Sequence, residues 1–316
     1  MHPLLDQQYW IIFGKTINAF LGRKNPYFGH AEITNYCNLK CKHCYWWINR
    51  NEKMKELDEA GWKYVIENIF KKNNVTQVWV AGGEPYLRPS IVKLFSELMP
   101  KKSNVVTNGT MPIKFFKGLT IYCISIDGTR EVHNAIRGPT YDQIVANVSE
   151  FVDTYGSDGK GFFTSISMTI NSINYKYVND VVREWQNLVA SMVVQFHTPF
   201  SYDDSLWLPY GSERDRLIDE LIKLKKEYPS FLLNPIRHIE AFRRPWGHKC
   251  ANWISISVDA FGRVKYPCPM GSADPDMKSP ICERCGCFSN SLVYSYGVKG
   301  NPTRDFYLYR KLPIAQ

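Results

Sequence analysis

Residues 37–44 read Cys37-Asn38-Leu39-Lys40-Cys41-Lys42-His43-Cys44 and directly follow a run that favours a β-strand. The three cysteines are one thiolate fewer than an electron-transfer 4Fe-4S cluster normally uses. A cluster held by three cysteines keeps one iron open, where it can bind a small molecule and pass it an electron. The CxxxCxxC spacing also differs from the ferredoxin runs. The stretch therefore predicts a reactive cluster at a strand end, and a partial zinc site is the alternative that the cysteines alone leave open.

Around this stretch, short β-rich runs alternate with helical periodicity. We expect strands at Phe28 to Thr34, Thr76 to Ala81, Asn104 to Thr107, Ile121 to Asp127, Phe162 to Ile170 and Met192 to Pro199. We expect helices through Trp62, Val65, Ile66, Ile69 and Phe70, then at Ile91 to Leu98, Tyr141 to Tyr155, Tyr177 to Leu188 and from Ser212 onward. Such βα units build a parallel sheet. Six of them predict an α/β fold with a partial (β/α)6 barrel of the TIM type, whose chemistry lies at the C-terminal strand ends.

The alternation stops after Asn234-Pro235, and the following segment is rich in Cys, Gly, Pro and aromatic residues. We therefore divide the chain into an N-terminal amphipathic helix (1–27), the partial barrel (28–235), and a small Cys-rich domain with its tail (236–316). The helix is inferred from apolar residues at helical spacing, Leu5, Tyr9, Ile12, Phe13, Ile17, Phe20 and Leu21. It either docks on the barrel or lies on a membrane surface as a peripheral contact. In the third part, residues 254–266 predict a β-hairpin with Gly262 in its turn.

The composition is that of an ordinary globular protein, because 44% of the 316 residues are hydrophobic and can form a well-buried core. Lys and Arg number 39 against 30 Asp and Glu, a formal net charge of +9. No stripe of basic residues interleaved with aromatics accompanies that charge, so we do not expect nucleic-acid binding. Eight of the nine cysteines fall into two groups rather than at scattered disulfide spacings, which favours a reducing compartment, the cytoplasm. The ninth, Cys123, is expected to be a small buried residue.

Three further motifs fall at expected strand ends. The second strand ends in Gly82-Gly83-Glu84, the third in Thr107-Asn108-Gly109, and the fourth in Ser125-Ile126-Asp127-Gly128, followed by Glu131 to Gly138. Together with the CxxxCxxC run, these segments resemble those of radical S-adenosylmethionine (SAM) enzymes related to the molybdenum-cofactor cyclase and the peptide-modifying maturases. The resemblance covers roughly residues 28–290.

The resemblance implies that Cys37, Cys41 and Cys44 hold a 4Fe-4S cluster whose open iron chelates SAM. Reduction then yields a 5′-deoxyadenosyl radical, while the protein supplies position and shielding. The residues implied at the SAM site are His43, Tyr45, Gly82, Gly83, Glu84, Thr107, Asn108, Ser125, Asp127, Arg137 and Ser167.

Individual roles follow from the same resemblance. The Gly82-Gly83-Glu84 motif positions the amino group of SAM, Ser125 and Arg137 contact its carboxylate end, and His43 packs against its adenine region. Each role has an alternative. The glycines form a simple turn, Arg137 is a surface or structural cation, or His43 is a metal ligand.

The second cysteine group comprises Cys250, Cys268, Cys282, Cys285 and Cys287. It resembles the auxiliary-cluster module called twitch, the shortened form of the SPASM domain, which binds one further 4Fe-4S cluster. The resemblance implies Cys250, Cys268, Cys282 and Cys285 as ligands, with Cys287 as a spare or an exchange for Cys285. A four-thiolate zinc site explains the same residues and stays open.

The function expected from this resemblance is reductive cleavage of SAM followed by hydrogen abstraction from a substrate, as an oxidoreductase or a transferase. The substrate is expected to be a peptide or a small polar metabolite, and the electron donor a reductant such as ferredoxin or flavodoxin. Action on a lipid or isoprenoid, by adenosyl transfer or carbon-carbon bond formation, is one alternative. A metal-stabilised nucleic-acid-binding module without catalysis is another. No catalytic residue is identified; His197, Tyr202, Asp203 and Asp204 are only generic polar residues near the barrel end.

Overall fold

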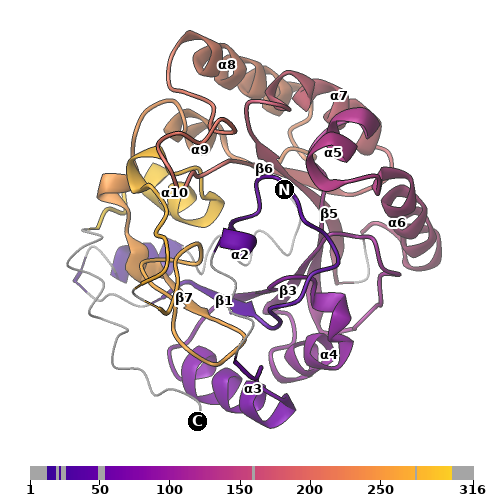
Figure 1. Ribbon diagram of the computed structural model, residues 1–316, viewed down its shortest axis with the longest axis vertical. Coiled ribbons are helices and arrows are strands. Elements are labelled where there is room, and N and C mark those ends of the chain that lie inside the picture. The colour runs from indigo at the N-terminus through magenta and orange to yellow at the C-terminus, as the bar shows by residue number, and fades with distance from the viewer. Residues whose placement is uncertain are drawn as a thin grey trace.

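The computed structural model describes residues 13–18, 21–22, 26–48, 54–158, 161–274 and 276–300. Its centre is one seven-stranded parallel sheet in the order β6-β5-β4-β3-β2-β1-β7. The strands are β1 (Phe28–Glu32), β2 (Gln77–Ala81), β3 (Ser103–Thr107), β4 (Leu119–Ser125), β5 (Phe163–Ile170), β6 (Ser191–Phe196) and β7 (Ser255–Val258). The six expected strands are all present, and the sheet curls into the partial barrel seen in Figure 1.

Alternation along each strand decides which side chains face the helices and which face the barrel interior. In β4, Tyr122 and Ile124 belong to the large apolar core beneath the helices, whereas Ile121 and Cys123 belong to a separate small apolar cluster that also contains Phe163 of β5. In β5 the apolar residues that face the helices alternate with Ser and Thr residues. Cys123 is buried, as the sequence predicts.

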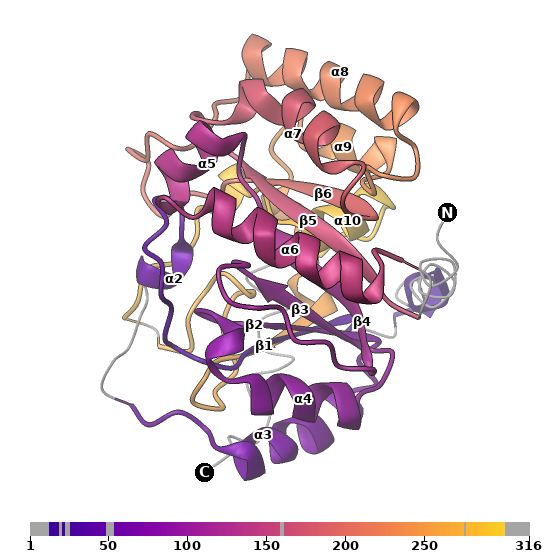
Figure 2. The same cartoon turned by 90° about the vertical axis from the view of Figure 1, so that its right-hand side faces the viewer.

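The helices between the strands lie on the outer face of the curled sheet (Figure 2). They are α3 (Glu59–Val65), α4 (Pro89–Leu98), α5 (Arg130–Arg137), α6 (Tyr141–Tyr155), α7 (Val178–Trp185) and α8 (Ser212–Glu227). A π-helical stretch, Ile66–Lys71, continues α3. The five residues that predict this first helix are fully buried, so its inward face is confirmed. A short helix, α2 (Tyr45–Ile48), lies inside the ring of strands in Figure 1.

The Cys-rich segment carries α9 (Ile236–Ala241) and α10 (Phe288–Ser295), and it is joined to both edges of the sheet. On one side β7 pairs with β1, although the sequence predicts only a local hairpin there. On the other side the amide of Phe196 in β6 donates to the carbonyl of Gly286 at 3.0 Å. The segment therefore lies across the gap between β6 and β7 (Figure 1). The division of the chain at residue 235 stays a prediction.

The expected hairpin is present as an extension of β7 rather than as a free unit. Val258 forms an antiparallel bridge with Val264, and Gly262 adopts the φ of 82° that the turn requires. The chain then runs through Lys265 towards Cys268. The hairpin thus links the barrel sheet to the second cysteine group.

Most of the predicted N-terminal helix, residues 1–12, 19–20 and 23–25, lies outside the described residues, and residues 13–18 are helical. The Lys15 ammonium donates to the carbonyls of Pro26 at 2.5 Å and Asn74 at 2.6 Å. Phe13 and Ile17 are about half exposed. The side of this helical turn that carries Lys15 therefore faces the barrel. Within the described part of the chain, no helix is long and apolar enough to cross a membrane.

Candidate functional site

The loop that carries Cys37, Cys41 and Cys44 extends from the C-terminal end of β1 across the barrel mouth. All three cysteines are free thiols of intermediate burial. Backbone bonds fix the loop to its neighbours: Glu84 N donates to Tyr36 O at 2.8 Å, and Lys42 N donates to Ile136 O at 3.0 Å. The three thiols are therefore presented from a loop anchored to both the β2 end and α5.

The glycine pair after β2 allows this anchoring. A Cβ atom on Gly83 would lie 1.9 Å from the carbonyl oxygen of Tyr36, closer than any side chain can approach. Gly82 has a φ of 135°, and a Cβ there would lie 2.6 Å from Thr34 O. The sequence predicts these glycines to be beside a ligand. In the structure their close neighbour is the cysteine loop itself, while contact with SAM stays a prediction.

Glu84 is fully buried and its carboxylate is already hydrogen-bonded. One oxygen accepts from Thr107 Oγ1 at 2.8 Å and from Tyr86 N at 3.0 Å, and the other accepts from Asn108 N at 2.8 Å. Burial raises the pKa of Glu84, and these donors oppose that rise. The carboxylate thus joins the ends of β2 and β3. This bonding favours a positioning role over the direct contact with a positive group that the sequence suggests.

Asn108 links the end of β3 to the cysteine loop. Its amide nitrogen donates to Asn38 Oδ1 at 2.8 Å and lies 3.9 Å from Cys37 Sγ. Leu39 N also donates to Cys37 Sγ, at 3.4 Å. N–H groups directed at sulfur are the contacts that stabilise and tune thiolates bound to a metal cluster.

A buried ion pair lies on the other side of the loop. Asp127, after β4, is fully buried and accepts from Arg137 Nε at 2.5 Å and from Thr169 N at 2.8 Å. Burial alone would raise the pKa of Asp127, but the charge of Arg137 and the hydrogen bond from Thr169 N help to outweigh it and the pKa is lowered. Arg137 Nη1 also lies 3.8 Å from Cys41 Sγ. Asp127 therefore holds Arg137 with its charge beside the thiols.

His43 joins the same network. Its Nε2 lies 3.3 Å from Asp127 Oδ2, and its ring is perpendicular to that of His197, with 6.4 Å between ring centroids. His197 in turn contacts Asp204 through Nε2 at 2.8 Å. Burial lowers the pKa of His43 to about 4, so the ring is neutral at pH 7. Packing of His43 against adenine stays a prediction.

Burial also raises the pKa values of the three thiols, that of Cys44 to about 11. Arg137 opposes the rise at Cys41 and Cys44. Without a metal the thiols are therefore protonated at pH 7. Binding of a metal cluster to them must release protons.

Ser125 and Ser167 lie side by side near the mouth, as register partners in β4 and β5. Both are half-buried, and Ser167 alternates with the buried core residues Ile166 and Met168, so it faces the barrel interior. The structure therefore brings these two serines together with Asp127 and Arg137. Their contact with SAM stays a prediction.

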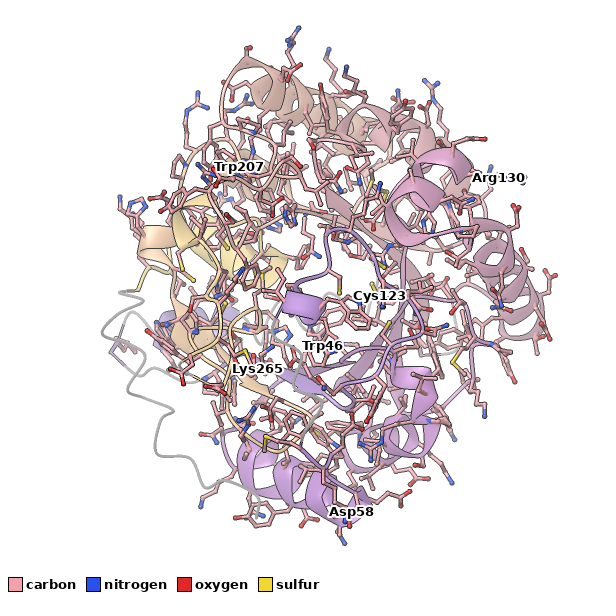
Figure 3. The ribbon with its side chains drawn as sticks, viewed as in Figure 1. Trp46, Asp58, Cys123, Arg130, Trp207 and Lys265 are labelled. Atoms are coloured by element: carbon pink, nitrogen blue, oxygen red, sulfur yellow. The ribbon has the colours of Figure 1, made fainter. Side chains whose placement is uncertain are left out.

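Contact of Tyr45 with SAM stays a prediction, and its neighbours in the structure are Glu32 and Lys265. Its hydroxyl contacts Glu32 Oε1 at 3.3 Å, and the ammonium of Lys265 lies 5.3 Å from its ring centroid. Lys265 also approaches the ring of Trp46, and Figure 3 shows Trp46 near the centre of the barrel with Lys265 to one side. Burial and the neighbouring carboxylate of Glu32 raise the pKa of Tyr45. Tyr45 therefore lies on the side that faces the second cysteine group.

The cysteines of the second group line one pocket with Asn290, Gly247 and Met270; they are Cys250, Cys268, Cys282, Cys285 and Cys287. Asn290 Nδ2 donates to Cys250 Sγ at 3.0 Å. Cys287 directly precedes α10, and the backbone amides of Ser289 and Asn290 bond its sulfur. The structure thus places the expected spare thiol in the same pocket as the other four. No three metal-binding side chains among the described residues converge as a site for one ion.

Sequence reasoning missed the buried residues around both cysteine groups. Glu32 and Lys265 form a buried ion pair, and Arg214 is buried beside the second group. The local signal for the first pair was a glutamate at the end of the β1 strand. Nothing near Arg214 in the sequence distinguishes it from the other charged residues of its helix.

Comparisons with known proteins agree with this geometry. Residues 31–185 match the sequence model of the radical SAM superfamily. The antilisterial bacteriocin subtilosin biosynthesis protein AlbA of Bacillus subtilis is 26% identical over 266 residues, which are 78% of this chain and 55% of AlbA. The sporulation killing factor maturation protein SkfB of the same organism is 28% identical over 170 residues, 50% of this chain and 39% of SkfB. The chain thus spans about half the length of AlbA.

Among solved structures, the fold is similar to that of Streptococcus suis SuiB bound to its precursor peptide SuiA. The TM-score is 0.64 at 15% identity, over 93% of this chain and 69% of SuiB. At this identity the similarity establishes the fold alone.

Proposed function

The chain belongs to the radical SAM superfamily, and we propose on that basis that it is an enzyme that cleaves SAM reductively and abstracts a hydrogen atom from a peptide. The observation that carries the proposal is the anchored three-thiol loop at the barrel mouth, with the cation of Arg137 beside Cys41. Three thiolates suit a 4Fe-4S cluster with one open iron. When bound, this cluster supplies the electron that cleaves SAM.

The residues present fit such a cluster. Cys37, Cys41 and Cys44 provide soft thiolate donors, which favour iron-sulfur clusters over hard oxygen-preferring cations. Asn108 and Arg137 direct N–H groups at two of the three sulfurs. The half-buried loop limits access of water to the sulfurs, and low polarity strengthens each of these contacts.

The residues of the β2 to β5 ends orient SAM in this proposal. Ser125, Ser167 and Arg137 offer two hydroxyls and a guanidinium at the mouth, a set that recognises a carboxylate. Asp127 keeps Arg137 oriented, and Glu84 fixes the backbone of the glycine motif. His43, neutral at pH 7, offers an aromatic ring with one buried nitrogen, Nδ1, that has no hydrogen-bond partner.

The second cysteine pocket is proposed to hold an auxiliary 4Fe-4S cluster. Five thiols line one pocket, and the hairpin between Cys250 and Cys268 that the resemblance shares with the auxiliary-cluster module is present. We therefore favour a cluster over a single tetrahedral zinc ion. The proposed ligands are Cys250, Cys268, Cys282 and Cys285, and Cys287, which directly precedes α10 and lines the same pocket, is a spare or an exchange for Cys285.

A peptide is the proposed substrate because SuiB, whose fold is similar, has been solved with a precursor peptide. By their names, AlbA takes part in bacteriocin biosynthesis and SkfB in the maturation of a killing factor. The proposed electron donor is ferredoxin or flavodoxin, and the proposed compartment is the cytoplasm, where thiolate ligands stay reduced. The substrate, the electron donor and the compartment are proposals, because the chain matches only 55% of AlbA.

The test is anaerobic reconstitution with iron and sulfide, followed by reduction in the presence of SAM. The expected result is about eight irons per chain and release of 5′-deoxyadenosine. Addition of the cognate peptide should raise that release and yield a peptide of changed mass. Binding of zinc without formation of 5′-deoxyadenosine would overturn the proposal, and release that no peptide stimulates would remove its substrate part.

A further inference from the structure

Arg214 of α8 is a buried cation without a counter-anion among the described residues. The residue is 1% exposed, and its Nη1 donates to the carbonyl of Leu208 at 3.1 Å. Its Nε has no hydrogen-bond partner, and no carboxylate pairs with it. The adjacent Asp215 is instead paired with Arg243 and Arg244. Since a buried unpaired charge is strongly destabilising, a nearby negative charge is expected.

Two aromatic rings hold the guanidinium. Its central carbon lies 4.3 Å from the ring centroid of Phe196 and 4.4 Å from that of Tyr210. Such cation–π contacts stabilise the charge in part, but they do not neutralise it. Both rings belong to residues that also bind the second cysteine loop.

These two residues place Arg214 next to the loop 282–287. Phe196 N donates to Gly286 O at 3.0 Å, and Gly286 lies between Cys285 and Cys287. Tyr210 Oη donates at 3.0 Å to the carbonyl of Glu283, which lies between Cys282 and Cys285. A Cβ on Gly286 would lie 2.0 Å from Phe196 O, so the loop packs directly on β6.

The thiols of this loop become negative charges when they bind a metal cluster. Burial lowers the pKa of Arg214 to about 10, and the charges of Tyr210, Asp215 and Cys285 oppose that change. The other cation near the pocket, Lys265, is already neutralised by Glu32. A 4Fe-4S cluster with four thiolates carries a net charge of about −2 when oxidised and about −3 when reduced.

We propose that Arg214 is the buried counter-cation of the auxiliary cluster and raises its reduction potential. The inference rests on the proposed function, because it requires a redox-active cluster in the second cysteine pocket. A fixed positive charge stabilises the reduced cluster more than the oxidised one, since the reduced form is more negative. In this proposal Arg214 acts on the cluster through its thiolate ligands and not by contact with a substrate, so it is a positioning residue.

The experiment is an EPR-monitored redox titration of the reconstituted full chain. SAM identifies the first cluster, because only the cluster with an open iron changes its signal when SAM is added. The variant Arg214→Gln should lower the reduction equilibrium constant of the second cluster at least tenfold, a shift of about 59 mV to more negative potential. Arg214→Lys should keep most of the wild-type value, and Arg216→Gln, an exposed residue of the same helix, should leave it unchanged.

The outcomes separate this inference from the proposed function. An Arg214→Gln protein with full iron content and an unchanged potential overturns the role of Arg214 while leaving the auxiliary cluster in place. Equal shifts in Arg214→Gln and Arg214→Lys also overturn it, because packing rather than charge would then be responsible. If the wild-type chain binds only about four irons, it holds no auxiliary cluster, and the inference fails with that part of the proposed function.

A second measurement covers a variant that folds poorly. Thermal unfolding of Arg214→Gln and of the wild type is compared with and without the metal clusters. The inference predicts a larger loss of stability in the cluster-loaded protein than in the metal-free chain, because the cation is unpaired without the thiolates. Equal losses in both states would contradict it.

Discussion

Lys265 is buried against the carboxylate of Glu32, a residue 233 positions away in the chain. Glu32 ends β1, which leads into the first cysteine loop, and Lys265 precedes Cys268 of the second. The ammonium also donates to the carbonyl of Pro269 at 2.6 Å, and Tyr45 contacts the same carboxylate. This single ion pair therefore connects the two cysteine sites.

Removal of the lysine should destabilise the protein in a pH-dependent way. Burial raises the pKa of Glu32 to about 7 even with Lys265 beside it. A raised folded-state pKa means that the stability from this group is present at low pH and is lost as pH rises through about 7. Lys265→Met should cost about 3–5 kcal/mol at pH 8.5 and less at pH 6, where Glu32 can take up a proton. Urea unfolding at both pH values checks this, and a cost that is equal at both would contradict it.

The glycine motif should be intolerant of one methyl group. Gly83→Ala places a Cβ against Tyr36 O, so the cysteine loop must shift. We expect the variant to fold and to lose most of the first cluster, about four irons of eight, together with SAM cleavage. Gly14→Ala is the matched control, because no atom lies within 4 Å of its new Cβ. Full iron loading of Gly83→Ala would show that the close approach is unimportant.

Arg137 should contribute to stability as well as to the site. Arg137→Gln leaves the buried carboxylate of Asp127 without its main partner, which typically costs about 3–5 kcal/mol. The double variant Asp127→Asn/Arg137→Gln should recover much of that loss, since no charge stays buried. Urea unfolding of the four proteins of this cycle measures the coupling. If Arg137→Gln lowers the free energy of unfolding by less than about 1 kcal/mol, Arg137 is not the main counter-charge of Asp127.

Acid should destabilise the fold through buried neutral histidines. His238 is fully buried, with its Nε2 2.7 Å from Ser291 Oγ, and burial lowers its pKa to about 3. A lowered folded-state pKa means that stability is lost as pH falls below the unfolded value of about 6.5. Between pH 6.5 and 5 the loss should be about 2 kcal/mol for this residue. His238→Gln should show a shallower decline, whereas His248→Gln, at an exposed position, should match the wild type.

The fold was predictable from the sequence because short β-rich runs alternate with helical periodicity along the chain. Those runs gave six strands and the helix through Trp62. The seventh strand, β7, was not recognised as part of the sheet. It has only four residues, and its pairing with β1 depends on contacts across more than 200 positions of the chain, which no local pattern encodes.

The candidate site was predictable only in part, for a related reason. The spacing of Cys37, Cys41 and Cys44 is local and therefore visible. The partners that set their environment, such as Arg137 beside Cys41, were visible through family resemblance. Glu32 with Lys265, and Arg214 beside the second loop, come together only through tertiary packing, so sequence periodicity could not find them.

The most direct measurement is formation of 5′-deoxyadenosine by reduced, reconstituted protein in two variants assayed together. Cys41→Ala removes one of three ligands of the SAM-binding cluster, and we predict that it forms none. Cys282→Ala affects the second pocket, and we predict that it still cleaves SAM while it no longer converts substrate. Continued formation of 5′-deoxyadenosine by Cys41→Ala would contradict the account.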